Sequence, residues 1–307
     1  MEASESILDR TRTISELEEV LEPTPWAILR QRIFGHRGFM FGAIVLVLIL
    51  TMALLAPVLS PHDPYDQQLS RRLINPIWHA DGAWTHPLGT DSMGRDYLSR
   101  LIYGARISLL IGIAAMLMSG IIGSTIGIAA GYFGGKVDMV ISFMITVRLA
   151  MPVALVAMAV VVLIGGSFQV VIFVLGFLIW DRFAVVMRSS TQQIRSVDYI
   201  NAAKATGCST PRILLTEILP NILNNLIVVA TLEMARAILL EAALSFLGMG
   251  VQPPLPSWGL MVSEAREYML FSPWLITIPG VTLFMLVLSI NLLGDGIRDI
   301  TAPESRG

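Results

Sequence analysis

Ionisable side chains lie within long apolar runs, where a charge costs about 2.5 to 3.5 kcal/mol at the centre of a membrane-spanning helix. The sequences ITVRLAMP, LIWDRFAV and TLEMARAILLEAAL contain Arg148, Asp181, Arg182, Glu233, Arg236 and Glu241. Glu233 and Arg236 are three residues apart, so they share a helix face and are predicted to pair. We expect these charges to face a bundle interior or a water-filled cavity, either as ion pairs that fix helix register or as the lining of a translocation path.

The sequence offers no pattern for hydrolytic or nucleotide chemistry. All four histidines lie outside the apolar runs, so no histidine-based zinc site or Ser/His pair is expected at bilayer depth: His36, His62, His79 and His86. The single cysteine, Cys208, excludes an intramolecular disulfide and a multi-thiolate metal site. Around Gly135-Lys136 a phosphate-binding loop is incomplete, because Val137 stands where Ser or Thr would bind magnesium. We predict no enzyme activity and no catalytic, cofactor or metal site, so ATP would be hydrolysed by another subunit.

The elements that carry these residues are membrane helices. Of 307 residues, 54% are hydrophobic and 14% charged, and the mean hydropathy is +0.70. Such a composition is typical of an integral membrane protein. Because backbone groups in lipid must bond internally, each long run is interpreted as a helix. The fold class predicted is all-α with six spans, at about 39–59, 104–132, 137–164, 168–187, 221–249 and 274–293.

Charge and small residues refine this arrangement. Most Lys and Arg residues outside the spans lie in segments that are cytoplasmic if both termini are cytoplasmic. The net charge of −2 is spread over the loops and gives no indication of nucleic-acid binding. In the second span, which is long enough to tilt, Gly123, Gly127 and Gly131 recur every four residues and favour close helix packing. Pro152 is expected to kink the third span.

The segment from 188 to 220 is the longest internal cytoplasmic connection, and its middle favours a helix. Asp198 is a plausible N-cap, Gly207 and Pro211 are expected to break the helix, and an apolar stretch then ends at Pro220. A short exposed helix of small residues suits docking into a partner groove. Before the first span, residues 25–38 combine aromatic and basic side chains, either as an amphipathic segment on the inner membrane surface or as a plain positive flank.

These features resemble the inner-membrane permeases of ATP-binding-cassette importers. The family signature is Glu-Ala-Ala, three residues, Gly, nine residues, Ile, one residue, Leu-Pro. The residues of this chain at the matching spacing are Asn201, Ala202, Ala203, Lys204 within the first gap, Gly207, Leu219 and Pro220, with Asn201 in place of glutamate and Glu217 in place of isoleucine. The segments HPLGTDSMGRDYLSRLIYGARISLLIG, AAGYFGGKVD, ALSFLGMGVQPPLPSWGLMV and NLLGDGIRD resemble the C-type subunit of the dipeptide/oligopeptide and nickel branch.

The resemblance implies a transporter with further subunits. It comprises a second homologous permease forming a heterodimer, two ATPase subunits that bind ATP and Mg, and an extracytoplasmic solute-binding protein, all at a prokaryotic inner membrane. The signature loop would couple the ATPases to a type I importer transmembrane domain. The expected organisation is a cytoplasmic tail over 1–38, a first span over 39–59, an extracytoplasmic loop over 60–103, a five-helix core over 104–295 and a cytoplasmic tail over 296–307.

Substrate and class stay open at this stage. Short peptides are the expectation from the resemblance, and nickel chelates, glutathione, opines or oligosaccharides are alternatives within the family. The rival from another class is an autonomous channel or secondary transporter, which often shows internal inverted repeats with broken helices. No such duplication is recognisable in this sequence.

Overall fold

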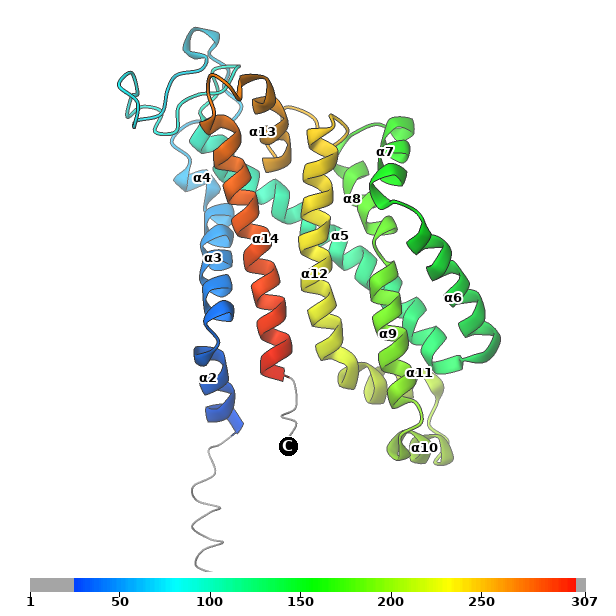
Figure 1. The fold of residues 1–307 in the computed structure, drawn as a ribbon. Helices are drawn as coiled ribbons and strands as arrows, with labels where there is room; N and C mark the ends of the chain where they lie inside the picture. The colour runs from blue at the N-terminus through cyan, green and yellow to red at the C-terminus, as the bar shows by residue number, and fades with distance from the viewer. Residues whose placement is uncertain (1–24, 302–307) are drawn as a thin grey trace, which may run out of the picture.

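A computed structural model describes residues 25–301, and this part of the chain is an all-α bundle without a β-strand. Its helices are α2 (Pro25–Gly35), α3 (Arg37–Leu54), α4 (Ala56–Leu59), α5 (Tyr97–Phe133), α6 (Gly135–Ala150), α7 (Val153–Ile164), α8 (Phe168–Leu178), α9 (Asp181–Ile194), α10 (Asp198–Ala205), α11 (Thr210–Arg212), α12 (Leu219–Phe246), α13 (Trp258–Ala265) and α14 (Trp274–Thr301). In Figure 1, α13 and the α4–α5 connection lie at one end of the bundle and α10 at the other, named here the α13 end and the α10 end. Of the predicted tails over 1–38 and 296–307, residues 1–24 and 302–307 lie outside the described residues.

Most of the predicted spans correspond to helices that are long enough to cross a bilayer. Four described stretches are long and apolar enough to cross a bilayer: 37–54, 97–133, 168–194 and 274–301. The pair α6 and α7 makes a fifth if the bent pair is one span. Helix α12 is 28 residues long but contains Glu233, Arg236 and Glu241, which lower its apolar character. The all-α membrane class is therefore confirmed, with four to five spans by length and composition.

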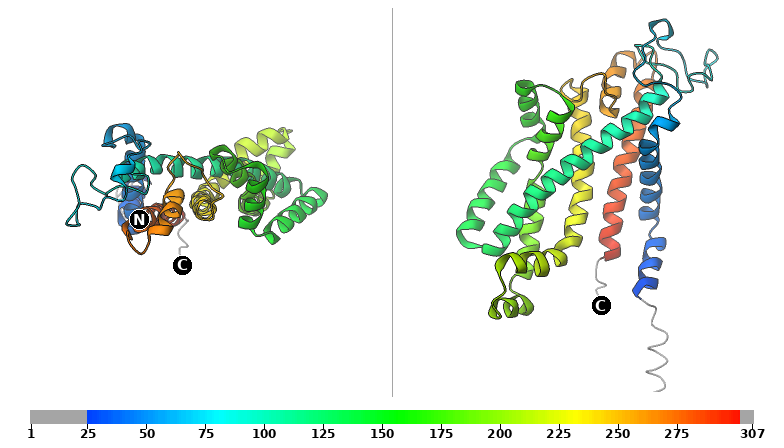
Figure 2. Two further views of the ribbon diagram at one scale, coloured as in Figure 1. Left: turned by 90° about the horizontal axis from the view of Figure 1, so that it is seen from above. Right: turned by 180° about the vertical axis from the view of Figure 1, so that it is seen from behind.

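Helix α5 runs diagonally across the bundle, whereas α3, α12 and α14 are more nearly parallel (Figures 1 and 2). At 37 residues it is about 55 Å long, well beyond the roughly 30 Å of a hydrocarbon core, so the predicted tilt follows from its length. It begins earlier than the predicted span because Asp96 caps it, accepting a hydrogen bond from the Ser99 backbone N–H. It packs against helices from both halves of the chain, including α9, α12 and α8.

The glycine repeat of α5 faces α9, as predicted for a close helix contact. A Cβ atom at Gly123 would lie 2.3 Å from the Trp180 carbonyl oxygen, and one at Gly127 would lie 2.5 Å from the Ala184 carbonyl oxygen. At Gly131 the nearest atom would be the Arg188 carbonyl oxygen at 2.7 Å. These obstacles are backbone atoms, which a rotamer change cannot move. The absence of side chains on this face of α5 therefore sets the distance between the two helices.

The third predicted span is broken where the sequence places Pro152. Helix α6 ends at Ala150, α7 begins at Val153, and the two axes differ by 83°. Proline cannot donate the backbone hydrogen bond that a continuous helix needs, so the prediction of a kink is confirmed and the bend is larger than a simple kink. The side chain of Arg148 lies beside the break, and its guanidinium donates to the carbonyl oxygens of Met151 and Leu178. The arginine thus satisfies carbonyl groups near the break.

At the α13 end, a buried charge network joins the start of α5 to α13. Arg100 is fully buried and donates to Glu264 at 2.7 Å, and it lies 3.3 Å from Asp91. Arg95 donates to Asp91 at 2.6 Å and to Glu264 at 3.2 Å. Two arginines and two carboxylates balance in charge, which a buried network requires. The indole of Trp258 completes the joint by donating to the Leu101 carbonyl oxygen at 2.9 Å.

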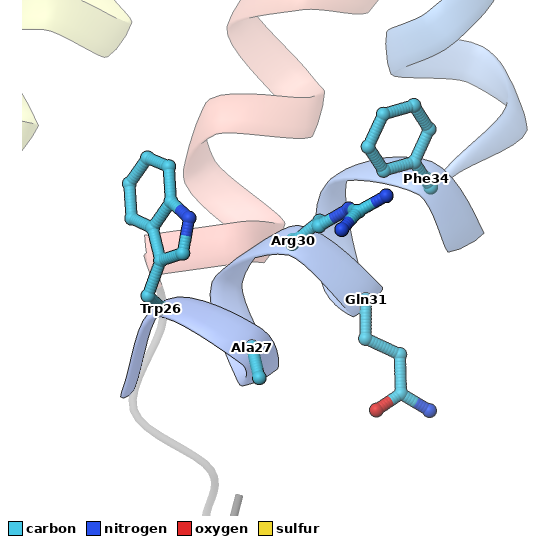
Figure 3. Close-up of a pocket in the computed structure, with 5 residues that line it drawn as sticks. All are labelled: Trp26, Ala27, Arg30, Gln31 and Phe34. Carbon is cyan, nitrogen blue, oxygen red and sulfur yellow. The ribbon is translucent and has the colours of Figure 1, made fainter. Parts of the chain in front are cut away.

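The segment before the first span is a helix of its own, α2, which ends at Gly35 before His36 caps α3. Figure 3 shows the rings of Trp26 and Phe34 on the same side of α2, with Arg30 between them, around a surface hollow. The Arg30 guanidinium lies 5.7 Å from the centre of the Phe34 ring. Both rings are exposed. An exposed aromatic and basic face agrees with a position at a membrane surface, which stays a prediction.

The contact between α5 and α9 yields a stability prediction. Gly127→Ala is expected to destabilise the protein by about 1 to 3 kcal/mol, because the added Cβ must displace the backbone of α9. Thermal unfolding of the purified chain in detergent micelles measures this change. Gly280→Ala is the matched control, since a Cβ at Gly280 in α14 would meet nothing within 4 Å. Equal melting temperatures for the two variants would show that the close approach is not required.

Candidate functional site

The predicted 188–220 connection begins later than expected, because α9 continues to Ile194. Helix α10 follows from Asp198 to Ala205, and Gly207 adopts a φ of +81°, so it ends the helix as predicted. The Gly207 and Cys208 backbone N–H groups close the helix by donating to the Lys204 and Ala203 carbonyl oxygens. The predicted cap was wrong by one residue, since Val197 occupies the N-cap position and Asp198 begins the helix.

The second half of this connection differs from the expected break. Residues Thr210–Arg212 form α11, Ile213–Ile218 form a π-helix, and α12 begins directly at Leu219. The helical path therefore passes through Pro220, whereas the sequence pattern predicted an end there. Proline is accepted at this point because it lies in the first turn of α12, where an unpaired N–H would be common. The connection thus reaches α12 without a flexible joint.

Apolar side chains fix α10 to the bundle, chiefly Ile200 and to a smaller extent Ala203. Ile200 is completely buried and belongs to a small core that it shares with Met187, Ile213, Ile218 and Ile222. These residues come from α9, the π-helix and α12, so the core is local to the α10 end. The remaining surface of α10 is available to a partner. Burial of Ile200, with partial burial of Ala203, positions the helix while leaving its outer face open.

The residues of the predicted docking surface are divided between α10 with its C-terminal turn and the start of α12. The exposed members are Asn201, Ala202, Lys204, Gly207 and Pro220, and the half-buried members are Ala203 and Leu219. The flanking residues Val197 and Tyr199 are exposed as well. In Figure 1, α10 projects beyond the other helices at its end of the bundle. The surface combines small, apolar and polar side chains, which is a composition suited to contact with a folded partner.

The α10 region is also joined to α5 by polar contacts that the sequence pattern did not predict. The Lys204 ammonium donates to the Arg195 carbonyl oxygen at 3.2 Å and lies 5.4 Å from the centre of the Tyr132 ring. The Arg195 guanidinium donates to the Gly131 carbonyl oxygen at 3.0 Å. Both α5 residues lie in its last turn. Movement of α10 is therefore tied to that end of α5.

A second link joins α9 to α6. The Arg188 guanidinium pairs with the Asp138 carboxylate, with its Nη2 atom at 2.8 Å, and Gln192 donates to the same carboxylate at 3.4 Å. The sequence did not predict the pair of Arg188 and Asp138, because the two residues are fifty positions apart. Together with the α5 contacts, this pair makes the α10 end a connected unit.

The buried charges meet between α9 and α12. Glu233 is completely buried, and its carboxylate accepts from the Arg236 guanidinium at 3.2 Å, which confirms the predicted pairing. Arg182 approaches the other oxygen of Glu233 at 3.4 Å from α9. Asp181 is buried and lies 4.0 Å from Arg236. Arg148 is buried beside the Pro152 break, and it interacts electrostatically with Asp181 and Arg236.

Arg182 differs from the expectation that every charge faces inward. Its side chain is 56% exposed, whereas that of Glu233 has no exposure. A cavity of about 260 Å³ opens beside the pair, and it is lined by Leu149, Arg182, Val185, Val186, Val229, Leu232 and Glu233. The wall is otherwise aliphatic. One side of the bundle thus exposes an arginine at the depth of the spans, with its carboxylate partner buried behind it.

Glu241 does not join this cluster. Its carboxylate is completely buried and accepts from the Ser245 hydroxyl at 2.7 Å and the Ser257 hydroxyl at 2.9 Å. Among the described residues it has no ion-pair partner within 4.0 Å. Ser257 is the N-cap of α13, so Glu241 connects α12 to α13 through hydroxyl groups. The sequence indicated a buried carboxylate but not this neutral environment.

Comparison with known proteins places this geometry in a family. Residues 123–307 match the family described as binding-protein-dependent transport system inner membrane component. Residues 24–76 match the N-terminal TM domain of oligopeptide transport permease C. The first match contains the 188–220 connection and both halves of the charge cluster, and the second contains α2 and α3. The two matches together cover most of the chain, and residues 77–122 lie between them.

Individual relatives agree along nearly the whole chain. The di/tripeptide transport system permease protein of Pseudomonas aeruginosa is 38% identical, over 92% of this chain and 93% of that protein. The dipeptide transport system permease protein of Escherichia coli is 37% identical, over 95% of this chain and 98% of that protein. The glutathione transport system permease protein of Pectobacterium atrosepticum is 34% identical, over 92% of each chain.

A solved structure shares the fold. The inward-facing MetNI methionine ABC transporter matches with a TM-score of 0.55 at 19% identity, covering 67% of this chain and 98% of the matched chain. At this identity the likeness concerns the fold alone. Together with the matches along the sequence, it leads to one assignment: the chain belongs to the family of binding-protein-dependent transport system inner membrane components, the multi-pass inner-membrane permeases of bacterial ABC importers.

Proposed function

We propose that this chain is the C-type permease subunit of an importer for short peptides. It would pair with a second homologous permease, receive peptide from an extracytoplasmic solute-binding protein, and be driven by two ATPase subunits that bind ATP and Mg. The exposed outer face of α10, fixed by Ile200 and tied to α5, is the observation that carries the coupling part of this proposal. The peptide substrate is supported by the names of the relatives from Pseudomonas aeruginosa and Escherichia coli.

The membrane arrangement follows from the same proposal. Counting α12 as a span despite its three charges gives six, the number expected for a type I importer domain. Both termini are then cytoplasmic, which agrees with the distribution of Lys and Arg and puts α10 on the cytoplasmic face. Helix α12 tolerates Glu233 and Arg236 because they pair with each other and face α9. The α13 end then faces the solute-binding protein.

The coupling role rests on geometry at two levels. The outer face of α10 offers the short side chains of Asn201 and Ala202, with the exposed ring of Tyr199 on the same helix. Behind it, Lys204 and Arg195 connect α10 to the last turn of α5. Movement of an ATPase subunit that pulls on α10 would therefore reach a helix that extends to the opposite end of the bundle. Asn201 carries no charge, so the ATPase contact would not depend on an acidic residue at this position.

The charge cluster has a part in the proposed pathway. Arg182 is exposed on the single chain, at a depth where lipid contact would be costly. A companion permease packed on this side would cover Arg182 or enclose a water-filled path beside it. The carboxylate terminus of a peptide in such a path would meet the exposed Arg182 guanidinium, whereas Glu233 is buried and paired with Arg236. Glutathione, also a short peptide, is the second candidate substrate, supported by the relative from Pectobacterium atrosepticum.

Uptake by the assembled transporter tests the function as a whole. Liposomes containing this chain, its companion permease and the two ATPases are expected to accumulate a labelled dipeptide when ATP, Mg and the binding protein are supplied. Unlabelled dipeptides and glutathione serve as competitors to define the substrate. Liposomes with this chain alone are the control and should show no accumulation. ATP-independent uptake by this chain alone would contradict the proposal in favour of an autonomous transporter.

Docking is tested by a bulky substitution on α10. Ala202→Trp is expected to weaken ATPase binding at least tenfold, because the indole occupies the space of the proposed groove, while membrane insertion is unchanged since Ala202 is exposed. Co-purification and ATPase activity measure the effect. Ala80→Trp is the matched control, an exposed alanine in the connection before α5 at the α13 end. If Ala202→Trp retains the ATPases as well as the wild type does, α10 is not the docking element.

The path role of the charge cluster is tested by Arg182. Arg182→Gln is expected to reduce peptide uptake several-fold without lowering the melting temperature, because its side chain is mostly exposed and contributes little to the single-chain fold. Arg182→Lys keeps the positive charge and should retain most of the uptake. Full uptake by Arg182→Gln would exclude a path role, and a lowered melting temperature in both variants would indicate a structural ion pair.

A further inference from the structure

Two histidines and an aspartate converge at the α13 end, in residues that the proposed transport cycle does not use. His62 and His86 lie in the connection between α4 and α5, and Asp96 is the N-cap of α5. One potential ligand atom from each of the three lies within 4.8 Å of the others. The Nδ1 atoms of His86 and His62 lie 2.9 and 3.7 Å from the same oxygen, Oδ1 of Asp96. The sequence predicted no metal site, because the histidines lie outside the apolar runs and Cys208 is the single cysteine.

The two oxygens of the Asp96 carboxylate have separate tasks. Oδ2 accepts from the Ser99 backbone N–H at 2.8 Å and from the Ser99 hydroxyl at 2.6 Å, which caps α5. Oδ1 faces the two imidazoles. The cap therefore fixes the carboxylate plane and leaves Oδ1 oriented toward the histidines. The cap of α5 uses only Oδ2, so Oδ1 is available as a metal ligand.

Hydrogen bonds to the backbone hold His62 in place, and burial holds His86 in place. The His62 backbone N–H donates to the Ser99 hydroxyl at 3.1 Å, and the Ser60 hydroxyl donates to the His62 carbonyl oxygen at 2.7 Å. The two imidazole rings lie 4.6 Å apart with planes 32° from parallel. His86 is buried, and its Nε2 atom has no hydrogen-bond partner within residues 25–301, whereas the His62 side chain is 40% exposed. The cluster is thus closed on the side of His86 and open to solvent on the side of His62.

The donor set selects a class of ion. Two imidazole nitrogens with one carboxylate oxygen suit zinc and similar divalent transition metals, whereas calcium and magnesium prefer oxygen ligands throughout. In a tetrahedral site with bonds of about 2.0 to 2.1 Å, neighbouring ligand atoms lie about 3.3 Å apart. The separations of 2.9 and 3.7 Å to Asp96 Oδ1 lie on either side of this value. Small side-chain rotations would bring all three donors to one ion.

We propose that His62, His86 and Asp96 form a binding site for a divalent transition metal ion of the zinc class. The fourth position opens to solvent beside His62. A bound ion would fasten the start of the α4–α5 connection to the first turn of α5, and it would replace the proton through which His86 bonds to Asp96.

Direct titration tests the proposal. The full chain, purified in detergent through a tag without histidine and stripped with a chelator, is titrated with Zn²⁺ against a chromophoric competitor. One Zn²⁺ per chain is expected. His62→Ala should weaken binding at least tenfold, whereas its melting temperature without metal should equal that of the wild type. His79→Ala is the matched control, a loop histidine that packs on Trp274 outside the cluster and should bind as the wild type does.

A second variant separates the ligand from the helix cap. Asp96→Asn keeps a side-chain oxygen for the Ser99 N–H but loses the negative charge, so it should bind Zn²⁺ at least tenfold more weakly while keeping the cap. Co²⁺ in place of Zn²⁺ should give visible absorption of a tetrahedral site in the wild type and not in His62→Ala. Equal Zn²⁺ affinity in the wild type and His62→Ala, or binding lost equally in His79→Ala, would overturn the proposal.

Discussion

The close approach of α5 to α9 is the constraint on which the rest of the bundle depends. Lipid is as apolar as the helix surfaces, so helices in a bilayer associate through packing and polar contacts rather than through water exclusion. With Gly123, Gly127 and Gly131 against the α9 backbone, the two helices meet at the shortest distance that the chain allows. This contact places Arg188 and Arg195, which follow on α9 and just after it, beside the ends of α6 and α5. The position of α10 is a consequence of that arrangement.

Buried charges lie at three levels of the bundle, and their partners differ from one level to the next. At the α13 end, Arg95 and Arg100 share Asp91 and Glu264, so two positive and two negative groups neutralise one another. Between α12 and α13, Glu241 has only hydroxyl donors. The level between α9 and α12 differs, because it is open on one side. Buried pairs seldom add much stability over apolar residues, so their value lies in fixing register or in transport.

Local chemistry in the sequence anticipated much of the fold. Pro152 predicted the broken third span and Gly207 the end of α10, because both act through their own backbone. The spacing of Glu233 and Arg236 predicted their pairing, because one helix turn determines it. Contacts between distant segments were not predictable in this way. The partners of Arg100 lie on two segments, one of them 164 residues away, and no periodicity links them.

The boundaries that differed have a common physical cause. Apolar runs mark the part of a helix that contacts lipid or core, whereas capping and packing determine where the helix ends. Helix α5 therefore begins at Tyr97, where Asp96 caps it, and α9 continues to Ile194 through polar residues that pack against α5 and α6. The π-helix at 213–218 has no recognised signature in the sequence. The proposed coupling role of the 188–220 connection comes from the resemblance to a family. Composition alone predicts only an exposed helix there.

The length of α5 has a mechanical consequence. An unbroken helix of 37 residues is a strut of about 55 Å, so a change in its inclination of roughly 5° displaces one tip by about 5 Å relative to the other. Asp96 lies at one tip of the helix. Tyr132 lies at the other tip, where its ring contacts the Lys204 ammonium. A small rocking of one rigid rod is therefore enough to convert a modest shift on one face of the membrane into a displacement larger than an atom on the opposite face.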